Sequence, residues 1–148
     1  MNKDETNLVM NRRAKHDYFI HDRFEAGLAL QGSEVKSIRA GKANLQESHI
    51  RILKTGAWLY GCHISPYLQA NRNNHDPVRP RQLLLKKPEV NKIRRGLAEK
   101  GMTVVPLRLY LKGQYIKVEI ALVKGKKLHD KRATLKQKEA KKEMARRR

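Results

Sequence analysis

The sequence predicts a mainly β fold, a small closed barrel with a few short helices between its strands. Three observations indicate it. Apolar and polar residues alternate in several runs, short turns that contain glycine join those runs in pairs, and only two segments inside the body of the chain have helical periodicity. A pattern of about five or six strands with short helices in the crossovers is typical of a closed barrel such as an OB-fold.

The chain opens with a long strand and a short helix. The run DYFIHDRFEAGLAL, residues 17–30, predicts the first strand, with Gly27 as a candidate bend or bulge. The run SEVKSIRAG, residues 33–41, predicts a helix that Ser33 caps at its N-terminus. We expect Val35 and Ile38 to face the core and Gly41 to lie just past the end of this helix.

Two hairpins and a second helix follow. HIRILK and AWLYGCHI flank the turn Thr55-Gly56 and predict the first hairpin. After the polar loop 71–82, the run PEVNKIRRGLAEKG, residues 88–101, predicts a helix with proline in its first turn and Gly101 at its C′ position. Its inner face holds Val90, Ile93 and Leu97, and its cations are expected to be solvated: Lys92, Arg94, Arg95 and Lys100.

The last two strands form the second predicted hairpin. TVVPLRLYL and YIKVEIALV surround the turn Lys112-Gly113-Gln114. Strict alternation would put four residues of the first run on one face, namely Val105, Leu107, Leu109 and Leu111, and the same holds in the second for Ile116, Val118, Ile120 and Leu122. Pro106 cannot donate a backbone hydrogen bond, so it indicates an edge strand or a bulge.

The charge of the chain points to a polyanionic partner. Its 148 residues hold 34 Lys and Arg against 14 Asp and Glu, a formal net charge of +20. Nucleic acid is therefore the first candidate partner and an anionic membrane surface the second. No apolar run approaches the roughly 20 residues that span a bilayer, and no secretory signal is recognisable. The single cysteine, Cys62, excludes an intrachain disulfide and predicts packing only. These features are typical of a cytoplasmic protein.

The charge is densest in the last 25 residues. Residues 124–148 hold 12 Lys and Arg against 3 Asp and Glu, with few large apolar side chains. We therefore divide the chain into a barrel, residues 1–123, and a basic tail, residues 124–148. The tail cannot bury enough apolar surface to order itself, so we expect disorder when it is free. The run ATLKQKEAKKEMARRR is rich in helix formers and lacks glycine and proline, which predicts a helix when an anionic partner is bound.

Four segments, in this order, resemble one known family. RRAKHDYFI, FEAGLALQGSEVKSIRAGKANL, DPVRPRQLLL and KGKKLHDKR are similar to small protein B, the tmRNA-binding family of bacterial ribosome rescue, and the likeness runs from about residue 12 to the C-terminus. The resemblance implies an OB-fold-like barrel that binds the tRNA-like domain of tmRNA. It also implies a tail that enters the empty mRNA path near the decoding centre and meets small-subunit RNA. Elongation factor Tu would be an indirect partner through the charged tmRNA, and the protein is expected to act as a monomer without a cofactor or metal.

The same resemblance suggests which residues bind RNA, and each has a second interpretation. Glu25 could accept hydrogen bonds from base edges or ribose hydroxyls, or it could orient a neighbouring arginine. Leu84 could pack on the RNA or fill the barrel. The cations could contact phosphates or simply be solvated. The candidate set comprises Arg12, Arg13, Lys15, His16, Glu25, Lys36, Arg39, Lys42, Arg79, Arg81, Leu84 and Lys86. Lys86 stands where relatives often carry an amide or imidazole, which puts a base-specific contact there in doubt.

The tail motif suggests a contact more specific than charge. An acid in a segment that meets phosphates would be a defect unless it has a partner, which favours a shaped contact around Asp130. His129 could stack on an exposed base while its basic neighbours hold phosphates. The candidate ribosome-binding residues are Gly125, Lys126, Lys127, His129, Asp130, Lys131 and Arg132.

The sequence argues against an enzyme. Its six histidines are scattered, and no metalloprotease, nucleophile-elbow, P-loop or paired-carboxylate spacing is present. The adjacent pairs His16-Asp17, His21-Asp22 and His75-Asp76 are expected to point apart on a strand. A structural ribosomal protein or a general RNA-binding protein with a basic tail remains the alternative function. Its stoichiometry would differ, because a structural protein sits on every ribosome whereas a rescue factor follows tmRNA.

Overall fold

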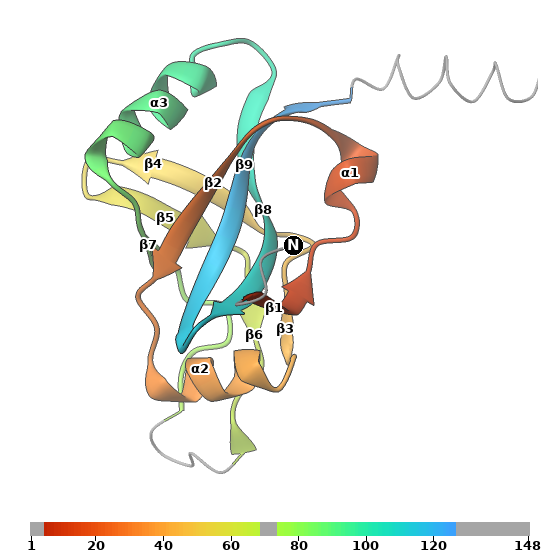
Figure 1. Ribbon diagram of the computed structural model, residues 1–148, viewed down its shortest axis with the longest axis vertical. Helices are drawn as coiled ribbons and strands as arrows, with labels where there is room; N and C mark the ends of the chain where they lie inside the picture. Colours follow the sequence, from red (N-terminus) through yellow and green to blue (C-terminus); the bar gives the residue numbers. More distant parts are fainter. Residues whose placement is uncertain (1–4, 69–73, 127–148) are drawn as a thin grey trace, which may run out of the picture.

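The computed structural model describes residues 5–68 and 74–126 (Figure 1). Along the chain the elements are β1 (Glu5–Met10), α1 (Ala14–Asp17), β2 (Tyr18–Leu28), α2 (Gly32–Arg39), β3 (Ala43–Asn44), β4 (His49–Leu53), β5 (Gly56–Tyr60), β6 (His63–Ile64), β7 (Arg81–Leu84), α3 (Lys87–Leu97), β8 (Met102–Lys112) and β9 (Tyr115–Gly125). The predicted mainly β fold with short helices is confirmed. The tail residues from Lys127 onward lie outside the described residues.

One seven-stranded sheet with purely antiparallel pairings forms the body of the fold. Its strand order is β1-β8-β9-β2-β7-β5-β4, and β3 and β6 form a separate small pair. The strand β4 also lies near β8, so the sheet curls back on itself. Within the described residues, however, no hydrogen-bonded pairing joins the β4 edge to the β1 edge, and the predicted closed barrel is not found.

Both predicted hairpins are confirmed, and one face assignment is wrong. β4 pairs with β5, and β8 pairs with β9 across a turn in which Gly113 has φ 60°. The β8 register shifts between Pro106 and Arg108, so the proline marks a bulge. The extra residue reverses the alternation, and Val105 and Leu107 therefore lie on the opposite face of the sheet from Leu109.

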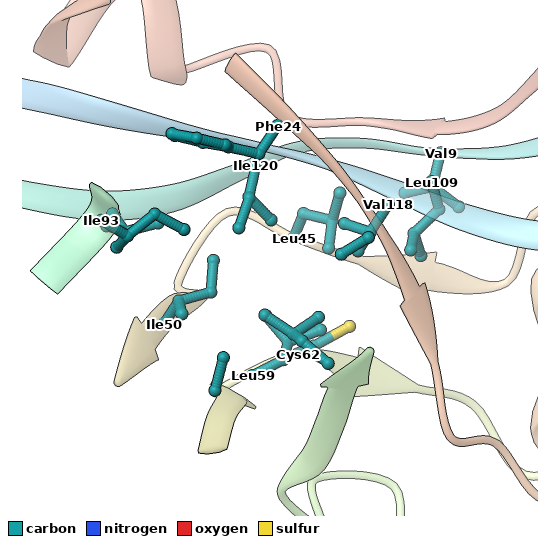
Figure 2. Packing of buried hydrophobic residues seen from close by; sticks show 14 of the residues in the cluster. Val9, Phe24, Leu45, Ile50, Leu59, Cys62, Ile93, Leu109, Val118 and Ile120 are labelled. Atoms are coloured by element: carbon teal, nitrogen blue, oxygen red, sulfur yellow. The ribbon is translucent and has the colours of Figure 1, made fainter. Parts of the chain in front are cut away.

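The main core lies on the concave side of the sheet. Figure 2 shows Val9, Phe24, Leu109, Val118 and Ile120 meeting side chains from β4, β5 and α3. A second, smaller cluster on the other face packs α1 onto β8 and β9, through Ala14, Val105, Leu107, Ala121 and Val123. The second cluster holds α1 in place, and it exists because the β8 bulge turns two apolar side chains outward.

The helix α2 begins differently from the prediction. Its N-cap is Gln31, and Glu34 accepts a hydrogen bond from the Gln31 backbone N–H at 2.8 Å. Ser33 lies inside the helix and contacts His75 instead, so its predicted capping role is wrong. Ile38 is fully buried, Val35 is half-buried, and Gly41 follows the helix with φ 74°.

The helix α3 begins as predicted but ends earlier: its last residue is Leu97 and its C-cap is Ala98, so the prediction of Gly101 at the C′ position is wrong. Proline lies in its first turn, and Ile93 is fully buried while Leu97 packs against the core. All four of its predicted solvated cations are exposed: Lys92, Arg94, Arg95 and Lys100. The sequence analysis did not predict the strand β1 or the helix α1. The first strand that it predicted is therefore β2, the second strand of the fold.

Candidate nucleic-acid interface

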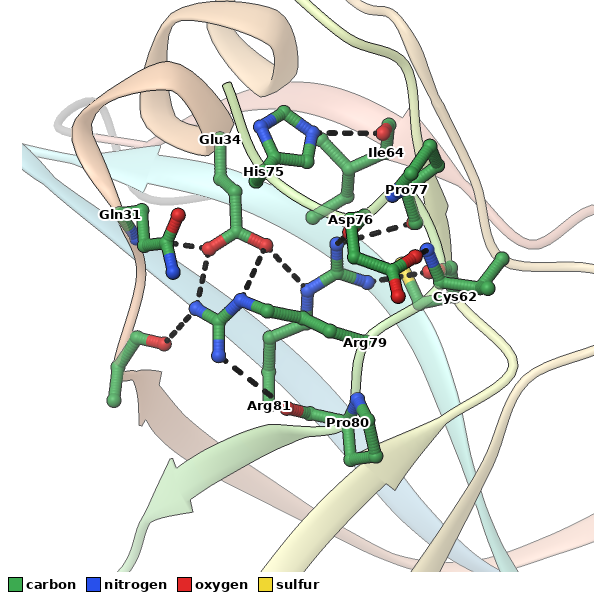
Figure 3. Close-up of polar contacts among 12 residues, drawn as sticks. Gln31, Glu34, Cys62, Ile64, His75, Asp76, Pro77, Arg79, Pro80 and Arg81 are labelled. Atoms are coloured by element: carbon green, nitrogen blue, oxygen red, sulfur yellow. Dashed lines mark hydrogen bonds and ion pairs between the residues drawn. The ribbon is translucent and has the colours of Figure 1, made fainter. Parts of the chain in front are cut away.

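A buried ion cluster joins α2 to the segment before β7 (Figure 3). The Glu34 carboxylate is fully buried and accepts hydrogen bonds from the Nε atoms of Arg79 at 3.1 Å and Arg81 at 2.6 Å. Arg79 also pairs with Glu34 through Nη2. The Arg81 guanidinium donates in addition to the carbonyls of Cys62, Asp76 and Pro77. Each charge in the cluster therefore has a partner, which a buried charge requires.

The cluster decides the ionisation of Glu34 and the role of Arg81. Burial alone would raise the pKa of Glu34, but hydrogen bonds from Arg79, the Gln31 backbone and Arg81 outweigh it and lower the pKa from its usual value. Arg81 has no exposed surface, and each of its three guanidinium nitrogens donates to a protein acceptor. The predicted phosphate contact of Arg81 is therefore corrected: its guanidinium holds the fold together. Arg79 remains about a quarter exposed, at 26% of its side chain.

His75 completes the connection between α2 and the following loop. Its Nε2 lies 2.9 Å from the Ile64 carbonyl, and its Nδ1 lies 2.8 Å from the Ser33 hydroxyl. Because a carbonyl can only accept, Nε2 carries the proton and Nδ1 accepts from the hydroxyl. A neutral imidazole satisfies both bonds. The histidine therefore ties the loop before β7 to α2 and to β6.

Glu25 lies on β2, and its side chain is partly exposed. Its carboxylate accepts a hydrogen bond from the Tyr110 hydroxyl and two from Lys112 Nζ at 3.2 Å, and 39% of its side chain is exposed. The hydrogen bond from Tyr110 is the largest cause that lowers the pKa of Glu25. Among the described residues no arginine contacts it, and its partners there are a phenol and an ammonium. The exposed part of the carboxylate can still accept from a ligand.

The α2 end of the sheet gathers several of the predicted RNA-binding residues. A shallow cavity of about 240 Å³ brings Arg39 together with Leu84, Tyr115 and Lys117. Leu84 is 56% exposed, so it does not fill the core. Next to this cavity, Lys36 lies over the Tyr67 ring at 5.3 Å. Exposed cations beside exposed apolar and aromatic side chains are the combination that binds phosphates and unstacked bases.

Two more candidates are exposed but do not line the cavity beside Leu84. Lys42 follows α2 and is exposed, and its carbonyl accepts from the Ser65 backbone N–H at 3.0 Å. Lys86 is exposed at the N-cap of α3, where its backbone N–H donates to Glu89 at 3.1 Å. Neither side-chain ammonium forms an ion pair within the described part of the chain.

The remaining candidates lie at the other end of the sheet. Arg12, Arg13, Lys15 and His16 surround α1, which Figure 1 shows far from α2. All four are exposed, and His16 Nδ1 contacts the Asp17 carboxylate at 2.9 Å. This pair was expected to point apart, but it lies on a helical turn rather than on a strand. Arg12 and Lys15 line a separate cavity of about 440 Å³ between β1, α1 and the outer face of the sheet.

The tail begins at the α1 end. The Lys126 backbone N–H donates to the Asp17 carbonyl at 3.0 Å, and its ammonium lies over the Phe19 ring at 5.1 Å. The strand β9 continues to Gly125, two residues past the predicted domain boundary. Gly125 and Lys126 are thus part of the described body. The other tail candidates, Lys127, His129, Asp130, Lys131 and Arg132, lie outside the described residues.

The structure adds residues that the sequence reasoning did not select. Tyr110, Lys112 and Tyr115 contact Glu25 or the cavity beside Leu84, and Glu34 holds Arg79. Alternation along β8 could have placed Tyr110 and Lys112 on the same face as each other. Their nearness to Glu25 depends on the pairing of β2, β9 and β8, which no local pattern specifies.

The described residues contain neither a metal-binding cluster nor a membrane-spanning helix. Across residues 5–68 and 74–126, no three His, Cys, Asp or Glu side chains come together in a way that could hold a metal ion. None of the described helices has the length and apolar character needed to cross a membrane. Burial raises the pKa of the Cys62 thiol to about 11, so this cysteine is neutral at physiological pH.

Comparisons with known proteins identify the family. The SmpB protein family model matches residues 8–148. An SsrA-binding protein of Desulforudis audaxviator is 51% identical over 142 residues, which cover 96% of this chain and 93% of the relative. One of Shouchella clausii is 52% identical over 139 residues, with 94% and 89% covered. A solved chain described as "tmRNA-SmpB: a journey to the center of the bacterial ribosome" is 42% identical with a TM-score of 0.69 and covers 83% of this chain and 87% of its own. The chain belongs to the SmpB protein family.

Proposed function

We propose that this protein binds the tRNA-like domain of tmRNA and delivers it to stalled ribosomes for rescue by trans-translation. The observation that carries the proposal is the identity of 51% to an SsrA-binding protein along 96% of the chain. The similarity to a chain from a tmRNA-SmpB structure, with a TM-score of 0.69, supports the same partners. The protein acts by binding and positioning RNA, and peptidyl transfer belongs to the ribosome.

The tmRNA-binding surface in this proposal is the α2 end of the sheet. Arg39, Lys36 and Lys42 supply exposed cations for phosphates, and Leu84 with Tyr115 supplies an apolar platform beside them. Arg79 donates to one more phosphate from a position that Glu34 fixes. The surface is oriented before the RNA arrives, because the buried cluster and His75 hold α2 against β7. Such pre-organisation lowers the entropy cost of binding.

The second part of the proposal concerns the tail. Residues 125–132 meet small-subunit RNA near the decoding centre, and the tail enters the mRNA channel only when it is empty. Elongation factor Tu joins indirectly through charged tmRNA, and the protein works as a monomer in the cytoplasm, where ribosomes translate. The tail leaves the body at Lys126, beside α1 and away from α2. A tmRNA bound at the α2 end would therefore leave the tail exit free.

A salt titration tests the RNA-binding part. The affinity for an isolated tRNA-like domain of tmRNA should fall steeply with salt, and each phosphate contact should add about −0.7 to −0.9 to the slope of log K against log salt. The double variant Lys36→Ala and Arg39→Ala should reduce that slope by about 1.5. The matched control is Arg94→Ala with Arg95→Ala, which removes equal charge from exposed positions on α3. A slope near zero for the wild type would overturn this part.

Glu25 can be tested for direct contact with RNA. Replacement Glu25→Gln removes a charged acceptor, and a charge-assisted hydrogen bond contributes about 1.5–3 kcal/mol, so affinity should fall about tenfold or more. Glu25→Ala should show the same loss while folding normally. The control Tyr110→Phe removes one protein donor but leaves the carboxylate in place. Unchanged affinity in both Glu25 variants would limit this residue to contacts within the protein.

Truncation separates the two parts of the function. A chain that ends at Lys126 keeps β9 and its last described backbone hydrogen bond. We expect it to bind the tRNA-like domain almost normally but to lose tagging of peptides on ribosomes stalled at an mRNA 3′ end. Replacing Asp130, Lys131 and Arg132 together by Ala should do the same, and replacing Lys141 and Lys142 should cost less. A truncated chain that tags peptides at the wild-type rate would refute the role of the tail.

A further inference from the structure

The cavity at the α1 end is lined by both apolar and charged side chains. It measures about 440 Å³ and lies between β1, α1 and the outer face of β2, β8 and β9. The apolar lining, or apolar wall, consists of Met10, Ala14, Ile20 and Leu107. The charged lining consists of four cations and a single carboxylate. Binding sites for small groups combine an apolar wall with a few fixed polar atoms in this way, and their volumes are about 300–1,000 Å³.

Two of the cations are held by acidic side chains. Glu119 accepts from Arg23 Nη1 at 3.1 Å and from Arg108 Nη2 at 3.3 Å. Arg108 also donates to Glu5 at 3.0 Å and lies over the Tyr110 ring at 3.9 Å. Glu5 and Glu119 together balance these two guanidiniums, so the net positive charge of the lining comes from Arg12 and Lys15. The Arg23 side chain is 52% exposed and keeps donors for a ligand.

The other two cations have no acidic partner within the described part of the chain. Arg12 and Lys15 are exposed at the rim of the cavity. Their backbone is held, because Ala14 packs into the second apolar cluster and the Lys15 carbonyl accepts from Lys126 Nζ at 3.5 Å. A rim of unpaired cations on a fixed turn favours an anionic group such as phosphate.

We propose that this cavity binds one unstacked nucleotide of an RNA strand. The base lies against the apolar wall that Met10, Ile20 and Leu107 form, and its phosphate meets Arg12 and Lys15. Asn7 and Glu119 line the same cavity; their oxygens accept from Arg108 and Arg23, and the remaining lone pairs can accept from base N–H groups. The inference rests on the proposed RNA-binding function, and it adds a specific nucleotide site far from the surface at α2. A single base in a pocket would fix the register of the RNA, which phosphate contacts alone do not do.

The volume and the wall chemistry favour a nucleotide over a free anion. Inorganic phosphate would use the cationic rim and leave the apolar wall in water. Met10 is 49% exposed, so a base that covers it gains apolar burial. Substitution of Met10 therefore distinguishes a bound nucleotide from a bound free anion, because it changes the apolar wall and leaves every charge in place.

The first measurement uses the full chain and four nucleoside monophosphates as probes. In amide chemical-shift titrations we expect shifts at Asn11, Arg12, Lys15 and Ile20, with affinity at least about fivefold stronger for one base than for inorganic phosphate. Met10→Ser should remove that difference and Met10→Leu should keep it. Equal shifts with inorganic phosphate and with every nucleotide, unchanged in Met10→Ser, would overturn the proposal.

The second measurement identifies the RNA that supplies the nucleotide. The variant Arg12→Ala with Lys15→Ala is compared with Arg94→Ala with Arg95→Ala, which removes the same charge from α3. If the nucleotide belongs to tmRNA, affinity for the tRNA-like domain falls at least about fivefold more in the first variant. If it belongs to ribosomal RNA, that affinity matches the control while ribosome binding and tagging fall.

Different results would refute the nucleotide site and the proposed function. Equal losses in the two double variants, with tmRNA binding and tagging otherwise intact, would refute the nucleotide site and leave the function standing. A wild-type chain that binds neither tmRNA nor ribosomes would refute the function itself.

Discussion

The substitution Glu34→Gln tests the buried cluster that holds α2 against β7. Glu34 accepts hydrogen bonds from the Gln31 backbone, Arg79 and Arg81, and it is the acid that both arginines share. Glutamine has nearly the same shape, so the packing changes little. It presents one donor group where the carboxylate presented an acceptor, and it removes the negative charge. Arg81, which has no exposed surface, then stays buried without a counterion.

The expected cost follows from the burial of the partners. Removing one member of a buried ion pair destabilises a protein by about 3–5 kcal/mol. Arg79 is 26% exposed and can be partly hydrated, and Arg81 keeps three backbone acceptors. We therefore expect the lower end, about 3 kcal/mol. For a domain of this size that corresponds to a fall in Tm of roughly 10–15 °C.

Urea denaturation of the full chain measures this loss. The control Glu25→Gln removes a carboxylate that is 39% exposed, and its cost should stay below about 1 kcal/mol. Arg81→Met removes the uncompensated charge but also the donors to three backbone carbonyls. The double variant should therefore cost at least about 1 kcal/mol less than the sum of the two single substitutions. A loss below about 1 kcal/mol for Glu34→Gln, or costs that simply add in the double variant, would refute the reasoning.

The same cluster makes stability depend on pH. The pKa of Glu34 is lowered in the folded protein, so its contribution is complete above the unfolded pKa of about 4.3 and is lost as pH falls through the folded pKa. The wild type should therefore lose free energy of unfolding more steeply below about pH 4 than Glu34→Gln does. Parallel pH curves for the two proteins would contradict an ionised Glu34.

Three further predictions concern packing. Gly61 has φ 75°, and an added Cβ would lie 2.6 Å from a backbone oxygen, so Gly61→Ala should lower the free energy of unfolding in urea by more than about 1 kcal/mol. The control is Gly32→Ala, whose Cβ would meet nothing within 4 Å and which should cost almost nothing. At Gly96 an added Cβ would lie 2.2 Å from Leu122, and Gly96→Ala should lower stability by about 1–3 kcal/mol, with a smaller cost when it is made in a Leu122→Ala background. The pKa of Cys62 is raised to about 11 by burial, so iodoacetamide at pH 8 should modify it only after unfolding, and rapid modification of the native protein would contradict its burial.

The local patterns predicted most of the elements. The alternation of apolar and polar residues predicted both hairpins and the long strand β2, and the 3.6-residue period predicted both main helices, α2 and α3. Each of these signals depends on neighbours in sequence, which is why a single chain is enough to detect it. The closure of the sheet could not be predicted in this way. It depends on how far the sheet curls and which edges pair, and the described pairings leave β1 and β4 unjoined.

The sequence predicted which types of residue form the candidate interface, but not where those residues lie in the fold. Charge and the family motifs selected the cations and Glu25, but one of them, Arg81, is fully buried. The acid that holds it, Glu34, lies 47 residues earlier in the chain. No periodic signal links two such residues. The arginine was assigned to RNA because an isolated sequence cannot show whether a cation already has a partner.

The sequence by itself determined that the chain is a basic, mainly β member of its family, because composition, alternation and motif order are properties of the chain alone. Only the tertiary structure decided how the cations are divided between the α2 end, the α1 end and the buried cluster. That division depends on non-local strand pairing and on the β8 bulge, which reverses the faces of Val105 and Leu107. An electrostatic contact forms where the packed backbone brings charges within a few ångströms, and burial then decides whether a charge serves the fold or a ligand.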